Sequence, residues 1–261
     1  MKLSISNIAW TKENDETIYA CLMQKGFLGL EIAPTRLFPE NPYEHLKEAS
    51  QYSKKLKKDY NLEIPSMQSI WYGKSESIFG TEQERQRLLG YTFKAIDFAE
   101  SVGCGNLVFG CPKNRNITSD KDYTIGIEFF RQLGEYAQQH HTVVALEANP
   151  VIYGTNFLNT TKEAITFCRE INNKCIGINY DLGTAIYNSE NYHICLENMD
   201  LINHVHISEP YLAKIKRREL HSQLLKDLEA GGYDKFVSIE MKTMEHIEDV
   251  YETINYVRDL V

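Results

Sequence analysis

Short apolar runs alternate with longer segments of helical period along the whole chain. The runs are mostly continuous rather than alternating, which is typical of parallel strands covered by helices. They recur about every 34 residues, the spacing of successive βα units in a barrel of this length. The eight runs are 2–6, 28–33, 62–69, 106–111, 142–148, 175–181, 204–208 and 235–241. The pattern predicts a single α/β domain over residues 1–261, a (β/α)8 TIM barrel.

The segments between the runs carry helix signals. Residues 81–103 begin with Thr81, have Glu84 three positions later and end at Gly103, the pattern of a capping box and a glycine stop. A weaker box is expected at Thr161 with Ala164, and a last helix is expected over 246–261. The main alternative is an open doubly wound sheet. The first run is followed by no glycine-rich phosphate loop, which argues against the dinucleotide-binding form of that alternative.

Composition and charge narrow the class of protein. The chain has 261 residues and a formal net charge of −8, so a nucleic-acid partner is disfavoured. No apolar run approaches the roughly 18 residues of a membrane-spanning helix, and no secretory signal is visible. The six cysteines form no zinc-like or C-x-x-C spacing, so free thiols and a soluble, cytoplasmic protein are expected. The run KKLKK at 54–58 is expected to be a solvated helix face.

Four consecutive runs have an ionisable residue at or near their carboxyl end. The catalytic groups of a barrel lie at the carboxyl ends of its strands. These residues are Glu147, Asp181, His206 and Glu240. Three carboxylates at one rim repel one another unless a cation neutralises them. The sequence therefore predicts one bound divalent metal ion. Oxygen and imidazole ligands without sulfur suit Mn²⁺ first, with Mg²⁺, Co²⁺ or Fe²⁺ as alternatives.

The stretches LEANP (146–150), NYDLGT (179–184), HVHISEP (204–210) and SIEMK (238–242) resemble metal-site motifs of the xylose-isomerase-like TIM-barrel superfamily. Ketose 3-epimerases and sugar phosphate isomerase/epimerases are its most similar members by pattern. The resemblance implies the same four metal ligands, with Glu147 and Glu240 also as the acid–base pair. It implies a sugar isomerase or epimerase that works through a metal-stabilised enediolate. His204 is expected to be an interior group behind the ligand His206.

Residues near other strand ends are candidates for binding a small sugar or sugar phosphate. They are Gln68, Lys113, Arg115, Glu209 and Lys242. The chain departs from ketose 3-epimerases at Thr184, where those enzymes usually have His, and at Pro210, which follows Glu209 in place of an early Arg. These departures leave the sugar open. Homo-oligomers are common among the relatives that the chain resembles.

Other functions remain open at this stage. An aldose–ketose isomerase or a keto-inositol-type dehydratase would share the first proton abstraction. An abasic-site endonuclease-like phosphodiesterase would need more histidines at strand ends, and Gln68 and Thr184 stand where two are expected. A non-catalytic sugar-binding barrel would be expected to lack one or more of the four ligands.

Overall fold

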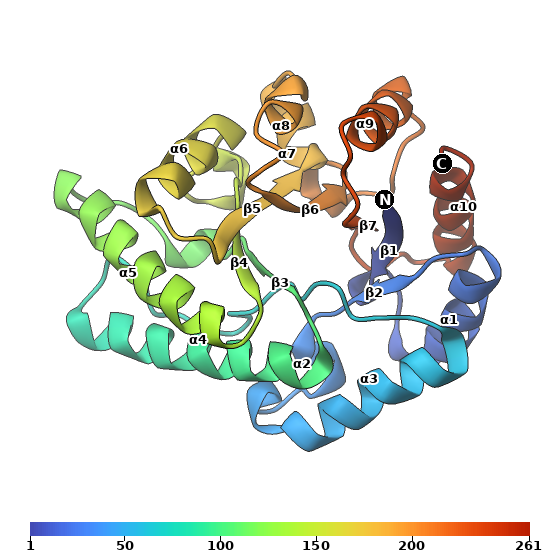
Figure 1. Ribbon diagram of the computed structural model, residues 1–261, viewed down its shortest axis with the longest axis horizontal. Helices are drawn as coiled ribbons and strands as arrows, with labels where there is room; N and C mark the ends of the chain where they lie inside the picture. Colours follow the sequence, from blue (N-terminus) through green and yellow to red (C-terminus); the bar gives the residue numbers. More distant parts are fainter.

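The computed structural model describes residues 1–261, and its strands form one curled, fully parallel sheet (Figure 1). The sheet order is β2-β1-β7-β6-β5-β4-β3, so neighbours in space are neighbours in sequence except where the chain ends meet. The strands are β1 (Lys2–Ser6), β2 (Gly29–Glu31), β3 (Asn106–Phe109), β4 (Val143–Glu147), β5 (Ile176–Asp181), β6 (Ile202–Ile207) and β7 (Phe236–Ile239). The predicted TIM-barrel architecture is confirmed.

The expected strand over 62–69 is wrong as a regular strand, because this segment makes only isolated bridges. Its backbone nevertheless fills the gap between β2 and β3. Leu30 N donates to Glu63 O, Gln68 N donates to Ile32 O and Val108 N donates to Met67 O. Pro65 stands in the middle and has no N–H to donate to a continuous ladder. The ring of strands is therefore closed by this irregular eighth segment.

Helices surround the sheet on its outer side (Figure 1). The α-helices are α1 (Asp15–Gln24), α2 (Pro34–Leu37), α3 (Leu46–Tyr60), α4 (Glu82–Val102), α5 (Asp120–Gln139), α6 (Thr161–Ile171), α7 (Leu182–Asn188), α8 (His193–Leu196), α9 (Glu219–Ala230) and α10 (Ile247–Arg258). Six 3-10 turns are interspersed: η1 (Asn7–Ala9), η2 (Lys12–Asn14), η3 (Pro42–Glu44), η4 (Pro112–Asn114), η5 (Val151–Tyr153) and η6 (Pro210–Leu212). None of the helices is both long and apolar enough to cross a membrane.

The predicted helix starts are mostly confirmed. The capping box of Thr81 and Glu84 opens α4, and Gly103 ends it in the left-handed conformation. The box of α6 lies one residue earlier than expected: Thr160 caps the helix and Glu163 completes the box. Thr160 is still extended whereas Thr161 is already helical, so only Thr160 has the geometry of a cap.

A cluster of 65 buried apolar residues fills the space between the sheet and the helices. In α3, Leu56 belongs to this core while the four lysines around it are exposed, as expected for KKLKK. All six cysteines are free thiols, three of them buried. Inside the ring the residues are more polar, and Ser4, Asn106, His204 and Ser238 are all buried there. The barrel thus has an apolar layer between its sheet and its helices, and hydrogen-bonded polar side chains inside the sheet.

Candidate metal and active site

The four predicted strand-end residues converge in the structure. Glu147 ends β4, Asp181 ends β5, His206 is the penultimate residue of β6 and Glu240 directly follows β7. Because these strands are parallel and adjacent, their carboxyl ends share one edge, where Asp181 pairs in register with His206. One ligand-capable atom of each residue lies within 4.8 Å of the corresponding atoms of the other three. The geometry is that of a compact donor cluster.

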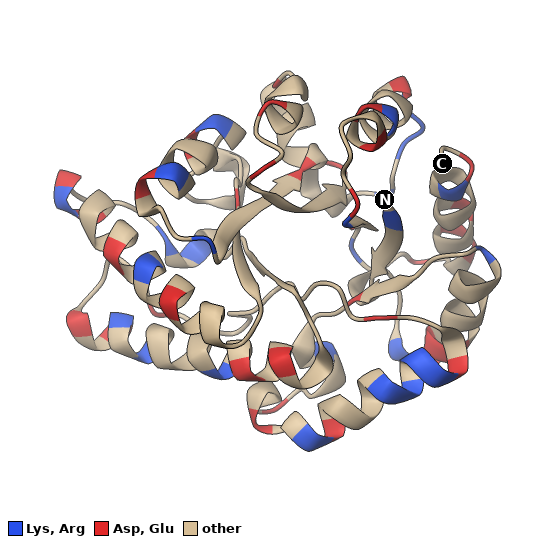
Figure 2. Ribbon diagram, in the orientation of Figure 1, with Lys and Arg blue, Asp and Glu red and all other residues tan.

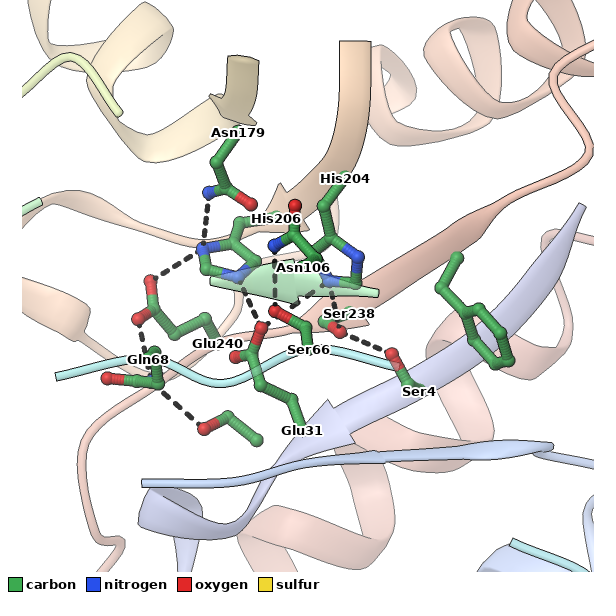
Figure 3. Close-up of polar contacts among 12 residues, drawn as sticks. Ser4, Glu31, Ser66, Gln68, Asn106, Asn179, His204, His206, Ser238 and Glu240 are labelled. Atoms are coloured by element: carbon green, nitrogen blue, oxygen red, sulfur yellow. Dashed lines mark hydrogen bonds and ion pairs between the residues drawn. The ribbon is translucent and has the colours of Figure 1, made fainter. Parts of the chain in front are cut away.

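His206 is held between carboxylates on both sides of its ring, of which Figure 3 shows Glu240 and Glu31. Its Nδ1 lies 3.2 Å from Glu147 Oε1 and 3.2 Å from Glu240 Oε2. Its Nε2 lies 2.9 Å from Oε2 of Glu31, the last residue of β2. Once His206 is neutral, as metal binding requires, a carboxylate that accepts the Nε2 proton fixes the tautomer in which Nδ1 presents a lone pair. The imidazole is therefore oriented as a metal ligand toward the cluster.

Burial and like charge set the protonation of the cluster. Burial, together with the nearby charges of Glu147 and Asp181, raises the pKa of Glu240 to about 7. Burial and the charge of Glu147 raise the pKa of Asp181 to about 6. Burial acts to raise the pKa of Glu31 too, but His206 and His204 outweigh it and lower that pKa to about 2. Burial opposes the charged form of His206, but Glu31 and Glu240 raise its pKa well above the ordinary value.

These observations fit a divalent cation. The donor set is three carboxylates and one imidazole, which hard and borderline cations prefer. The carboxylates of Glu240 and Asp181 are close enough to oppose each other's ionisation, and a cation between them would remove that repulsion. The same four residues were predicted from the strand ends.

Side-chain amides hold the two glutamates. Gln68 Nε2 donates to Glu240 Oε1 at 2.9 Å. Asn149 Nδ2 donates to Glu147 Oε2 at 3.0 Å, and Asn179 Nδ2 donates to Glu147 Oε1 at 2.7 Å. Each glutamate therefore has one oxygen facing His206 and the other fixed by an amide, from Gln68 or from Asn149.

Asp181 is oriented by the start of α7 and by a hydroxyl that follows β6. Its Oδ1 accepts from the backbone N–H of Thr184 at 2.6 Å and so caps α7, and its Oδ2 accepts from the hydroxyl of Ser208. Ser208, Asn149 and Asn179 are not among the residues predicted from the sequence. The signal that could have found them is the strand period: each lies two residues from a predicted ligand and shares its face of the sheet.

A cavity of about 190 Å³ lies over the cluster. It is lined by Gln68, Ser69, Val108, Gly110, Cys111, Pro112, Glu147, Asn149, Tyr153, Asp181, Glu209, Leu212 and Glu240. Three of the four cluster residues belong to this lining, whereas His206 is completely buried beneath it. A bound molecule would therefore face the carboxylates directly.

Of the five residues expected to bind substrate, Gln68 and Glu209 line the cavity. Lys113 and Lys242 are exposed and lie outside the lining, because their side chains turn to solvent. Arg115 is completely buried behind the lining, where its Nη2 donates to Glu147 O and to Asn149 Oδ1, both at 2.9 Å. The expectation that these three cations reach the pocket is not met by the structure.

His204 lies deeper in the barrel than His206, as expected. Its Nε2 is 2.7 Å from Ser238 Oγ and 3.4 Å from Glu31 Oε2 (Figure 3). Burial lowers the pKa of His204 to about 3, so it is neutral. It links the polar centre of the barrel to the carboxylate that orients His206.

A model of the family described as "Xylose isomerase-like TIM barrel" matches residues 22–260. The chain belongs to this family. Its strand-end cluster is thus found on a barrel of the kind that the sequence motifs resemble. No curated protein matches the chain.

Solved structures with this family's fold align over nearly the whole chain. A 3-keto-D-glucoside 4-epimerase from E. coli, in its apo form, has 22% identity and a TM-score of 0.78, with 99% of each chain covered. A D-psicose 3-epimerase crystallised with D-fructose has 14% identity and a TM-score of 0.78, covering 100% of this chain and 96% of its own. A protein named IolI, with a zinc atom bound, has 15% identity and a TM-score of 0.72, over 100% and 96%. At these identities the likeness shows the fold.

Proposed function

We propose that this protein is a divalent-metal-dependent sugar isomerase or epimerase. The observation that carries the proposal is the cluster of three carboxylates and one imidazole at the floor of a cavity. Two of the similar structures are epimerases of sugars and a third holds a zinc atom, which supports the same chemistry.

Glu147, Asp181, His206 and Glu240 would hold the ion, with Mn²⁺ as the first candidate and Mg²⁺, Co²⁺ or Fe²⁺ as alternatives. When bound, the ion would supply positive charge beside the oxygens of a sugar in its enediolate form. Glu31 would keep His206 in the ligating tautomer, and Ser208 and the Thr184 N–H would orient Asp181. The protein's part is to hold these donors before substrate arrives.

Glu147 and Glu240 are the proposed acid–base pair. An epimerase removes a proton from a carbon next to a carbonyl on one face and returns one on the other, so two bases are required. The two glutamates come from β4 and from the end of β7, and both line the cavity. Gln68 and Asn149 keep both carboxylates pointed at the cavity.

Metal analysis followed by proton exchange tests this proposal. The purified protein is expected to bind about one divalent ion per chain, and the loaded enzyme should exchange a carbon-bound proton of a ketose with solvent deuterium. Glu147→Gln and Glu240→Gln should each lower the exchange at least about 100-fold, the scale of a lost acid–base group. Glu245→Gln, at an exposed position after β7, is the matched control and should exchange normally.

The products separate the remaining activities. A stereoisomer or an aldose indicates an epimerase or isomerase, whereas loss of water from the substrate indicates a dehydratase. Cleavage of a phosphodiester, or no metal bound and no exchange with any sugar, would refute the proposal.

A further inference from the structure

We propose that the substrate is an uncharged, unphosphorylated sugar, an inference that rests on the proposed function. The lining of the cavity contains four acidic side chains and not one Lys, Arg or His. The acidic residues are Glu147, Asp181, Glu209 and Glu240. A pocket for a sugar phosphate is expected to place at least one cation or helix N-terminus against the phosphate.

No basic side chain lines the cavity: those near it are turned to solvent, buried behind the lining or paired with a carboxylate. Lys113 and Lys242 are exposed, outside the lining. Arg115 is completely buried behind the lining. Its Nη2 donates to Glu147 O, and its Nε and Nη1 are buried without hydrogen bonds. In Figure 2 Lys and Arg lie mainly on the outer helices.

Besides the buried Arg115, Arg218 is the guanidinium that touches a lining residue by its side chain, and its charge is already neutralised by a carboxylate. It binds Glu209 in a bidentate pair, with Nε to Oε1 and Nη2 to Oε2 both at 2.7 Å. Glu209 is almost completely buried, so its carboxylate depends on this partner. The pair therefore leaves no positive charge for a phosphate.

A phosphate monoester carries a charge of about −1.5 to −2 at neutral pH. Four lining carboxylates are opposed by the adjacent guanidinium groups of Arg115 and Arg218, so even with a divalent ion in the cluster the site has no net positive charge. Repulsion is stronger in such a partly enclosed site than in water, because the local dielectric constant is lower. A phosphate group is therefore disfavoured wherever it enters.

The rest of the lining suits hydroxyl groups. The hydroxyls of Ser69 and Tyr153 can bond to sugar hydroxyls without a charge of their own, whereas the neutral amides of Gln68 and Asn149 hold the two glutamates. The volume of about 190 Å³ is below the ~300–1,000 Å³ of pockets for drug-sized ligands. The space corresponds to a small sugar.

Matched pairs of sugars test the inference. We would compare D-fructose with D-fructose 6-phosphate, and other free ketoses with their phosphate esters, on the metal-loaded protein. Solvent deuterium exchange gives kcat/KM, and ligand-observed NMR gives binding even where no exchange occurs. We expect the free sugar of a pair to have at least a ten-fold higher kcat/KM, or at least ten-fold tighter binding. Stronger binding or faster exchange of the phosphate esters would overturn the inference.

Exchange and binding distinguish the two proposals. If no sugar exchanges but free sugars still bind better than their esters, the proposed function fails and the inference stands. If no free sugar in the panel binds, the inference fails. In Glu209→Gln, which removes one lining charge and releases Arg218, the preference for the free sugar should fall several-fold. Glu245→Gln should keep it. An unchanged preference in Glu209→Gln would show that lining charge does not select the substrate and would overturn the argument.

Discussion

Replacing Glu31 by glutamine tests whether the carboxylate behind His206 sets the metal affinity. Glu31 Oε2 accepts from His206 Nε2 at 2.9 Å, and both side chains are completely buried. In Glu31→Gln the new amide would keep an acceptor oxygen but lose the charge, so a charge-assisted hydrogen bond becomes a neutral one of about half the strength. Loss of such an outer partner lowers metal affinity about 10–100-fold, equivalent to about 1–3 kcal/mol.

Isothermal titration of the metal-free protein with Mn²⁺ at pH 7.5 measures this effect directly. Circular dichroism and thermal unfolding of the metal-free variant establish that the barrel is intact. Glu31→Asp retains the charge and is expected to recover part of the affinity, whereas Glu245→Gln should bind as the wild type does. If Glu31→Gln binds Mn²⁺ with unchanged affinity while Glu147→Gln does not, then Glu31 does not prepare the imidazole and the reasoning is refuted.

Three further predictions concern stability. The raised pKa of Glu240 means that the metal-free folded state binds an extra proton between about pH 4.5 and 7, so its contribution to stability is present at low pH and is lost as the pH rises through 7. Glu240→Gln should therefore gain in stability relative to the wild type from pH 5 to 8, by up to about 3 kcal/mol in urea titrations, and a constant difference would contradict this. Arg218→Ala leaves the buried Glu209 unpaired and should cost about 2 kcal/mol in the same assay, with a cost near zero counting against the pair. Thr81→Ala removes the cap of α4 and should cost about 1 kcal/mol, seen as a lower Tm, whereas an unchanged Tm would show that the cap is dispensable.

The strand-end residues could be predicted from the sequence because parallel strands force their carboxyl ends together. Once the runs ending in Glu147, Asp181, His206 and Glu240 are taken as adjacent strands, little freedom is left for their side chains. The same logic works for α4, where Thr81 and Glu84 determine the helix start locally. Predictions of this kind depend on periodicity and on short-range chemistry, both of which are present in the sequence.

The residues after the strand ends could not be placed in the same way. Lys113 and Arg115 lie two positions apart in one short loop, yet the first is exposed and the second is completely buried. The direction of each side chain depends on the turn of η4 and on the neighbouring loop that carries Asn149, which no local pattern specifies. Likewise, the run 62–69 has the composition of a strand, and only the neighbouring backbones show that it pairs intermittently.

The irregular segment 62–69 between β2 and β3 carries Gln68. The side chain of Gln68 donates hydrogen bonds both to Glu240 and to Ser6 Oγ. This part of the ring is joined to its neighbours by isolated bridges, whereas β7 pairs continuously with β1 and β6. Glu240 is thus held by a side chain from the irregular segment, and Glu147 by Asn149 and Asn179 from the side of the ring built of continuous strands. The two proposed acid–base glutamates therefore depend on backbone of unequal regularity, although both lie at the same edge of the sheet.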